Sequence, residues 1–97
     1  MLFHITHTHT WETCMIHDPE KAKNTVGKVL ANPESTGVKI IGAYVDPPAH
    51  TFYIIVETDK VENIQAFLEP IIDLGYADIR PVSDAVSTVK KVVEGHE

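Results

Sequence analysis

The sequence predicts an α+β domain of the ferredoxin-like type, with elements in the order β-α-β-β-α-β and a further helix at the end. Runs of β-branched and aromatic residues alternate with segments in which apolar residues recur every three or four positions. Two of the strand-like runs, at 38–45 and 51–58, are joined by a short loop and indicate a hairpin. We expect one domain over residues 1–97, with a core at 1–82 and a C-terminal helix at 83–94.

The first element is a strand over residues 2–9, which is rich in β-branched and aromatic types and contains no glycine or proline. Side chains alternate along a strand, so one face is expected to carry Phe3, Ile5, His7 and His9. Residues 10–17 form a loop. A helix then begins at Asp18-Pro19, a capping residue followed by a proline at the first helical position, and ends at Asn32-Pro33.

The hairpin strands at 38–45 and 51–58 flank a loop whose two prolines cannot donate to a sheet ladder. The second of these strands is the most apolar stretch of the chain and is expected to be central. A second helix follows, with Asp59 as its cap and an apolar stripe from Val61 to Ile72. Pro70 falls inside this stripe, so a break is expected near Glu69-Pro70.

The last strand, at 76–82, contains Pro81, which marks a strand at a sheet edge or the end of a strand. Ser83 is expected to cap the final helix, which carries valines at helical spacing. The predicted strand order is 4-1-3-2, with both internal helices on one face of the sheet. The other face is left bare and needs a cover, and a second copy of the chain is the simplest one. The final helix is the alternative cover.

Composition and charge exclude several classes of function. The net charge is -6, which argues against binding to nucleic acid or to an anionic membrane surface. No apolar run approaches about 18 residues, so no membrane span is expected. The N-terminal segment lacks the features of a secretory signal, so a cytoplasmic location is expected. Cys14 is the single cysteine, which excludes an intramolecular disulfide.

The hairpin GVKIIGAY and TFYIIVETD (37–44 and 51–59) resembles that of the dimeric α+β barrel proteins. The segment FLEPIIDLGY (67–76), followed by DIRPV (78–82), is similar to that superfamily too. The likeness covers about residues 1–82 and is greatest to small uncharacterised members. It implies a homodimer. The superfamily includes cofactor-free monooxygenases, muconolactone isomerases, haem-handling enzymes and binding modules, and no catalytic motif of these is carried over to this chain.

Histidine is the unusual feature of the composition, because four of the six histidines lie in the first 17 residues. His7 and His9 point the same way in a strand, at a spacing that lets two imidazoles converge on one ion. In the predicted fold His50, at the start of the third strand, reaches the same end of the sheet. The loop adds Cys14 and His17. His4 and His96 are expected outside this group.

We therefore predict a transition-metal site drawn from His7, His9, His50, His17 and Cys14. Zinc is the first choice, with copper, nickel or iron as alternatives. A histidine in a strand is more often a packed or exposed side chain than a ligand, and that reading stays open. So do two others: Cys14 as a nucleophile beside His17, and Glu57 as a buried acid with a proton-transfer role. Tyr44, Tyr53, Phe52 and Trp11 could line an apolar pocket or belong to the core.

The sequence thus predicts a small homodimeric metal-binding protein, in which the metal is sensed, stored or used in small-molecule chemistry. One alternative is a metal-free dimeric barrel enzyme, of monooxygenase or isomerase type, that acts on a small aromatic substrate with a histidine as general base. A non-enzymatic module that binds a small ligand or a protein is the other. Whether the chain is an enzyme is left open.

Overall fold

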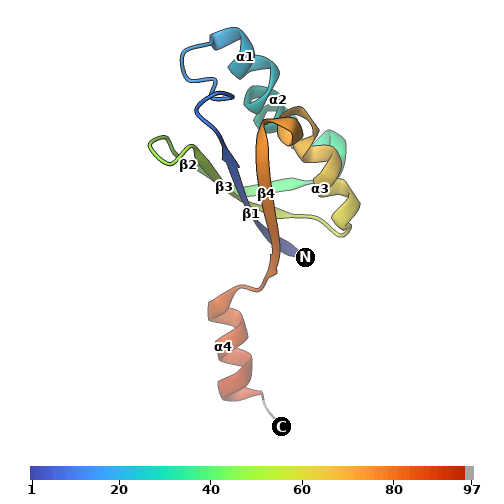
Figure 1. The fold of residues 1–97 in the computed structure, drawn as a ribbon. Coiled ribbons are helices and arrows are strands. Elements are labelled where there is room, and N and C mark those ends of the chain that lie inside the picture. The colour runs from blue at the N-terminus through green and yellow to red at the C-terminus, as the bar shows by residue number, and fades with distance from the viewer. Residues whose placement is uncertain (96–97) are drawn as a thin grey trace.

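The four strands form one antiparallel sheet in the order β2-β3-β1-β4, as predicted. The computed structural model describes residues 1–95, so His96 lies outside it. Figure 1 shows the α+β, ferredoxin-like arrangement. Its elements are β1 (Leu2–His9), α1 (Pro19–Asn24), α2 (Val26–Ala31), the 3₁₀ turn η1 (Pro33–Thr36), β2 (Lys39–Asp46), β3 (Thr51–Glu57), α3 (Val61–Leu68), η2 (Glu69–Leu74), β4 (Gly75–Val82) and α4 (Ala85–Glu94).

The register of the sheet fixes which residues meet at the end where β1 finishes. Thr8 lies opposite Thr51 of β3 and opposite Tyr76 of β4, and His9 lies opposite Gly75. Both neighbours of β1 run antiparallel to it, so the end of β1 meets the beginning of β3 and of β4. The predicted central position of β3 and the edge position of β4 are confirmed.

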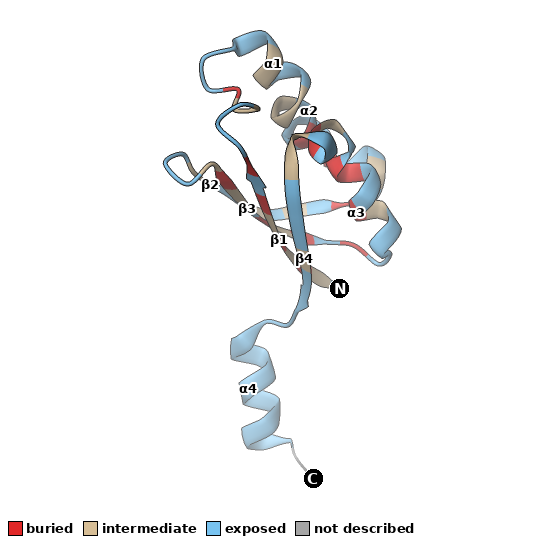
Figure 2. Ribbon diagram, in the orientation of Figure 1, coloured by how far each residue is buried: buried red, intermediate tan, exposed pale blue. Residues whose placement is uncertain are grey.

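The hydrophobic core lies between one face of the sheet and the helices on that face, and Figure 2 shows the buried segments gathered there. Strands β1 and β3 contribute side chains from alternate positions, Val38 comes from the link before β2, and the helical layer contributes the rest. The fully buried members are Phe3, Ile5, Val29, Val38, Ile54, Val56, Ile64, Phe67, Leu68 and Ile71. Burying one such side chain stabilises the fold by about 1.5–3 kcal/mol, so this layer holds the sheet and helices in place.

The first helical segment differs from the prediction, because it is two short helices rather than one. Thr25 interrupts it with non-helical backbone angles, and its hydroxyl donates a 2.6 Å hydrogen bond to the carbonyl oxygen of Lys21. Side-chain bonds of this kind compete with the helix ladder. The predicted end at Asn32-Pro33 is confirmed.

The second helical segment breaks where the proline requires it. α3 ends at Leu68, and Pro70 lies in the first turn of η2. Two predicted caps are wrong by one residue. The cap of α3 is Lys60 rather than Asp59, and it makes no side-chain hydrogen bond. The cap of α4 is Asp84 rather than Ser83, since the Asp84 carboxylate accepts from the backbone N–H of Ser87.

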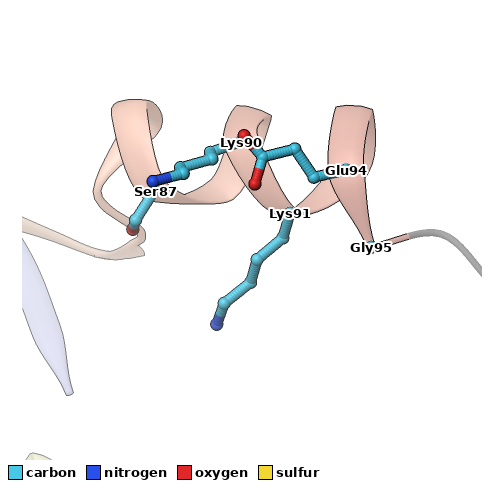
Figure 3. Close-up of a pocket in the computed structure, with 5 residues that line it drawn as sticks. All are labelled: Ser87, Lys90, Lys91, Glu94 and Gly95. Atoms are coloured by element: carbon cyan, nitrogen blue, oxygen red, sulfur yellow. The ribbon is translucent and has the colours of Figure 1, made fainter.

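The final helix stands apart from the rest of the molecule. Figure 1 shows α4 extending beyond the sheet, and no residue of it is buried. Val86, Val89 and Val93 are each more than half exposed, so α4 does not cover the bare sheet face. Figure 3 shows the polar side of the same helix, where Lys91 extends away from it. None of the helices in residues 1–95 has the length and apolarity needed to cross a membrane.

Candidate metal centre

Strand β1 places His7 and His9 on the face that packs against the helices, as the alternation predicted. Both are buried, with 2% and 6% of their surface exposed. The position of His9 depends on Gly75, the residue paired with it on β4. A Cβ atom at Gly75 would overlap the carbonyl oxygen of Thr8 and lie 2.8 Å from the Cα of His9. Glycine therefore lets β4 approach the site-bearing end of β1 closely.

A tight turn between β2 and β3 presents His50. The backbone N–H of His50 donates to the carbonyl oxygen of Pro47 at 3.1 Å, and Asp46 accepts from the N–H of Ala49. His50 has a φ of 52°, the left-handed region that costs a non-glycine residue about 1–2 kcal/mol. Its carbonyl oxygen accepts a 3.0 Å hydrogen bond from the N–H of His9. Backbone bonding therefore fixes the two histidines relative to each other.

Cys14 comes from the loop after β1, which is fastened to the 3₁₀ turn η2. The hydroxyl of Thr13 donates a 2.7 Å hydrogen bond to the carbonyl oxygen of Leu74. The N–H of Cys14 donates to the carbonyl oxygen of Trp11 at 3.4 Å, within a turn. The thiol is free and half-buried. The Thr13 hydrogen bond thus anchors the loop to η2, and the thiol of the next residue lies close to the two imidazoles.

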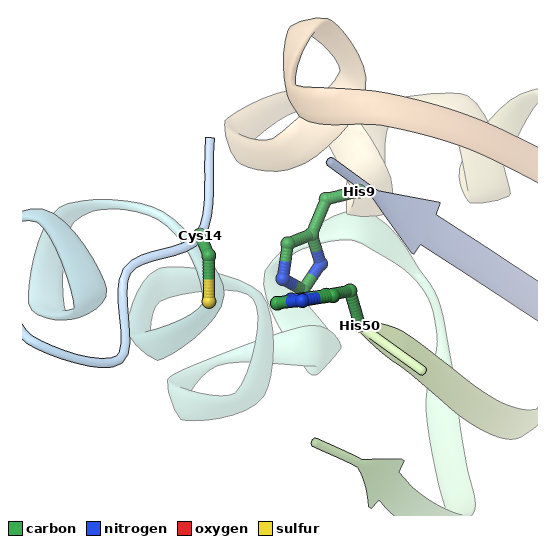
Figure 4. Close-up of side chains that lie close together, drawn as sticks. All are labelled: His9, Cys14 and His50. Atoms are coloured by element: carbon green, nitrogen blue, oxygen red, sulfur yellow. The ribbon is translucent and has the colours of Figure 1, made fainter. Parts of the chain in front are cut away.

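His9, Cys14 and His50 bring one donor atom each to within 4.8 Å of one another. Figure 4 shows the two rings close together, with the Cys14 sulfur directed toward them. The ring centroids of His9 and His50 lie 5.2 Å apart in an edge-to-face arrangement. Both ring nitrogens of His9 and the Nδ1 of His50 are buried without a hydrogen-bond partner. Two imidazoles and a thiolate are a donor set that suits zinc and other borderline or soft transition metals.

Burial lowers the pKa of His7 and of His9 and so favours their neutral forms. Desolvation lowers the pKa of His9, and the positive potential of His50, His7 and Lys21 lowers that pKa further. Desolvation also lowers the pKa of His7, against the opposing effect of its hydrogen bond to a backbone carbonyl. Neutral imidazole is the form that coordinates a metal ion. The environment of His9 therefore prepares it as a ligand.

The structure does not bring His7 and His17 into the three-residue group. The Nε2–H of His7 donates a 3.0 Å hydrogen bond to the carbonyl oxygen of Ile71, and its ring centroid lies 6.4 Å from that of His9. His17 is exposed in the loop. His4 lies on the opposite face of the sheet, 6.3 Å from the ring of Tyr53, in keeping with its predicted exclusion.

An apolar cavity of about 250 Å³ adjoins the three donors. Its walls are made by Met15, Ile16, Val45, Pro47 and Phe52. Of the four aromatic side chains proposed as pocket lining, Phe52 alone is in this wall. Tyr44 and Tyr53 lie on the open sheet face and Trp11 is 77% exposed. Glu57 is exposed at the end of β3, which does not fit a buried acid.

Sequence reasoning missed the parts of this site that depend on backbone contacts. The turn residues Pro47 and Pro48 signalled a loop, but nothing signalled the left-handed backbone of His50. The Thr13 contact joins residues 61 positions apart and leaves no local trace. From the sequence, Gly75 indicated only the end of a helical segment. In the structure its lack of a side chain also lets β4 approach His9 closely.

Comparison with known proteins identifies a family and a fold. The family described as "Domain of unknown function (DUF3303)" matches residues 1–96. No curated protein matches the sequence. Among solved structures, SCO4226 from Streptomyces coelicolor A3(2) is similar, with a TM-score of 0.60 and 21% identity. The match covers 88% of this chain and 99% of that protein, and at this identity it supports the fold alone.

Proposed function

The chain belongs to the DUF3303 family, a domain of unknown function. We propose from the geometry of its site that it is a small transition-metal-binding protein whose ligands are His9, Cys14 and His50. The supporting observation is the set of buried ring nitrogens without partners on two converging histidines. Leaving a buried polar group unpaired costs about 1–3 kcal/mol. An ion at the centre of the three donors gives one nitrogen of each ring a partner and accounts for their convergence on a thiol.

The donor set favours zinc, with copper, nickel or iron as alternatives. A thiolate ligand selects against hard cations such as magnesium, and imidazole suits all four of the metals named. Of the five side chains predicted as ligands, three are retained. We assign His7 a supporting role, because it is not among the three side chains whose donor atoms converge and its Nε2 is hydrogen-bonded to Ile71. We leave His17 out of the ligand set, because its side chain is exposed.

Metal titration of the untagged protein tests this function. Purified protein is stripped with a chelator and titrated with cobalt(II), whose visible spectrum reports tetrahedral coordination and thiolate ligation. We expect one equivalent to bind per chain and zinc to displace it. Cys14→Ser is expected to remove the sulfur contribution to the spectrum, and His50→Ala to weaken binding. His4→Ala is the matched control. Wild-type protein that binds no cobalt or zinc overturns the proposal, as does a Cys14→Ser spectrum identical to that of the wild type.

We further propose a homodimer of the dimeric α+β barrel type, formed through the open sheet face. Leu2, Ile55 and Tyr53 lie on this face, and Tyr44 beside them is 66% exposed. The valines of α4 are a second uncovered apolar surface. Light scattering of the full chain is expected to give twice 10.8 kDa. Tyr44→Lys is expected to shift the protein toward monomer, and a monomeric wild type at micromolar concentration contradicts the dimer.

A cytoplasmic location follows from the same proposal. The thiolate must stay reduced to act as a ligand, and the reducing compartments of the cell provide that condition. Expression with a reporter that scores compartment checks this point.

One observation supports the alternative function, a metal-free enzyme that acts on a small aromatic substrate. The apolar cavity adjoins a neutral, buried His9, which is an arrangement suited to a general base acting on a small apolar substrate. The two functions differ in their response to chelators: turnover of an aromatic substrate that persists in excess chelator supports the enzyme without metal.

A further inference from the structure

The cavity beside the three donors offers space for a second ligand. Its lining consists of one polar group and an otherwise apolar wall. Three of its lining residues carry polar side chains, and these are His9, Cys14 and His50 themselves. The other lining side chains are apolar, and the phenyl ring of Phe52 lies 5.8 Å from the His9 ring. A molecule in this space would touch apolar surface everywhere except at the donor group.

The proposed metal centre has fewer protein ligands than a closed site. Among residues 1–95 three side chains from His, Cys, Asp and Glu converge, whereas structural zinc sites hold four. All three donor residues line the cavity. An ion bound to them therefore has its remaining coordination position open to the cavity, the pattern of sites that bind an exchangeable ligand.

Charge determines what kind of donor fits that position. A divalent ion held by one thiolate and two neutral imidazoles keeps a net charge of +1. An uncompensated charge beside apolar walls is costly, and an anionic donor atom removes it. No acidic residue lines the cavity to do so. A bound ligand with an anionic donor atom therefore supplies the charge that the protein does not.

We propose that this cavity binds a small apolar thiol as its thiolate, with the sulfur completing the coordination of the metal and the apolar body against the Met15, Val45 and Phe52 walls. On binding, the thiol releases its proton to solvent, and the sulfur takes the position otherwise held by water. The volume of about 250 Å³ is at the small end of ligand sites and fits one aromatic ring or a short aliphatic chain. This inference rests on the proposed metal centre.

The test uses 4-fluorothiophenol with the zinc-loaded full-length chain, followed by fluorine NMR. Three comparisons isolate the two parts of the ligand. 4-Fluorotoluene lacks the donor, and chelator-treated protein lacks the metal. 2-Mercaptoethanesulfonate lacks the apolar body and carries no fluorine, so its affinity is measured by how far it displaces 4-fluorothiophenol. We expect the aromatic thiol to bind the zinc protein at least about 10-fold more tightly than in any of these comparisons, equivalent to about 1.4 kcal/mol. Zinc retained by the protein is measured in the same samples.

A wall variant makes the cavity part of the proposal falsifiable separately. Val45→Asn changes a half-exposed wall residue outside the donor set, and Val86→Asn makes the same change on α4. We expect Val45→Asn to weaken thiol binding several-fold at unchanged zinc stoichiometry, and Val86→Asn to have no effect. A protein that binds no zinc refutes the metal centre. If zinc binds but the thiol binds zinc-loaded and zinc-free protein equally, or removes the zinc, this inference alone is overturned.

Discussion

Replacing His9 with leucine tests whether the buried histidine is kept for metal binding at a cost to stability. In the metal-free protein both nitrogens of a ring that is 6% exposed lack partners. Each such group costs about 1–3 kcal/mol, and leucine, similar in volume, removes both. Imperfect repacking beside Phe52 costs up to about 1.5 kcal/mol in return. With about 1 kcal/mol for each nitrogen, the low end of that cost, we expect His9→Leu to be more stable than the wild type by about 0.5–2 kcal/mol in excess chelator.

Zinc should reverse this order. Binding to the native state adds about 2.7 kcal/mol at a free zinc concentration of 100 times the dissociation constant, and the variant lacks this gain. Urea unfolding followed by circular dichroism, with chelator and with zinc, measures both differences. His4→Leu is the matched control, because its ring lies on the other face, and its response to zinc should equal that of the wild type. A His9→Leu protein that is less stable than the wild type in chelator refutes the reasoning about unpaired nitrogens.

Three further outcomes follow from the same contacts. Burial lowers the pKa values of His7 and His9, so the unfolded chain binds more protons below pH 6.5; the metal-free protein should lose stability as the pH falls below that value, measured by urea midpoints. His50→Gly should leave the metal-free protein about 1 kcal/mol more stable than His50→Ala, because glycine adopts a φ of 52° freely; equal thermal midpoints would contradict this. Gly75→Ala should destabilise the fold and weaken cobalt binding, because its Cβ would displace His9; an unchanged cobalt spectrum and midpoint would show that β4 can shift without disturbing the site.

The strands and their order were predictable because the information is local. Alternation over 2–9 placed Phe3 and Ile5 in the core and His7 and His9 beside them, and the apolar run at 51–58 predicted a central strand. Helix limits were less well predicted. Thr25 interrupts the first helix through a single side-chain bond, whose strength relative to the helix ladder cannot be judged from residue types alone.

The candidate site, too, was predictable only where its geometry follows from strand direction. His9 and His50 could be paired from topology, because antiparallel strands bring the end of β1 to the start of β3. The exclusion of His7 could not, because it depends on which donor atoms converge and on the hydrogen bond that turns one ring nitrogen of His7 toward Ile71, 64 residues away. Cys14 and His17 are three residues apart on one loop, and which of them faces the site depends on where Thr13 fastens that loop to Leu74.

The sequence by itself determined the fold class, the strand order and the end of the sheet at which the histidines gather, because periodicity and strand direction are properties of local segments. Only the tertiary structure decided which donors converge, since that depends on backbone contacts between distant segments: the left-handed turn at His50, the close approach allowed by Gly75 and the Thr13 bond to η2. These contacts bring His9, Cys14 and His50 together out of the five side chains that were predicted as ligands.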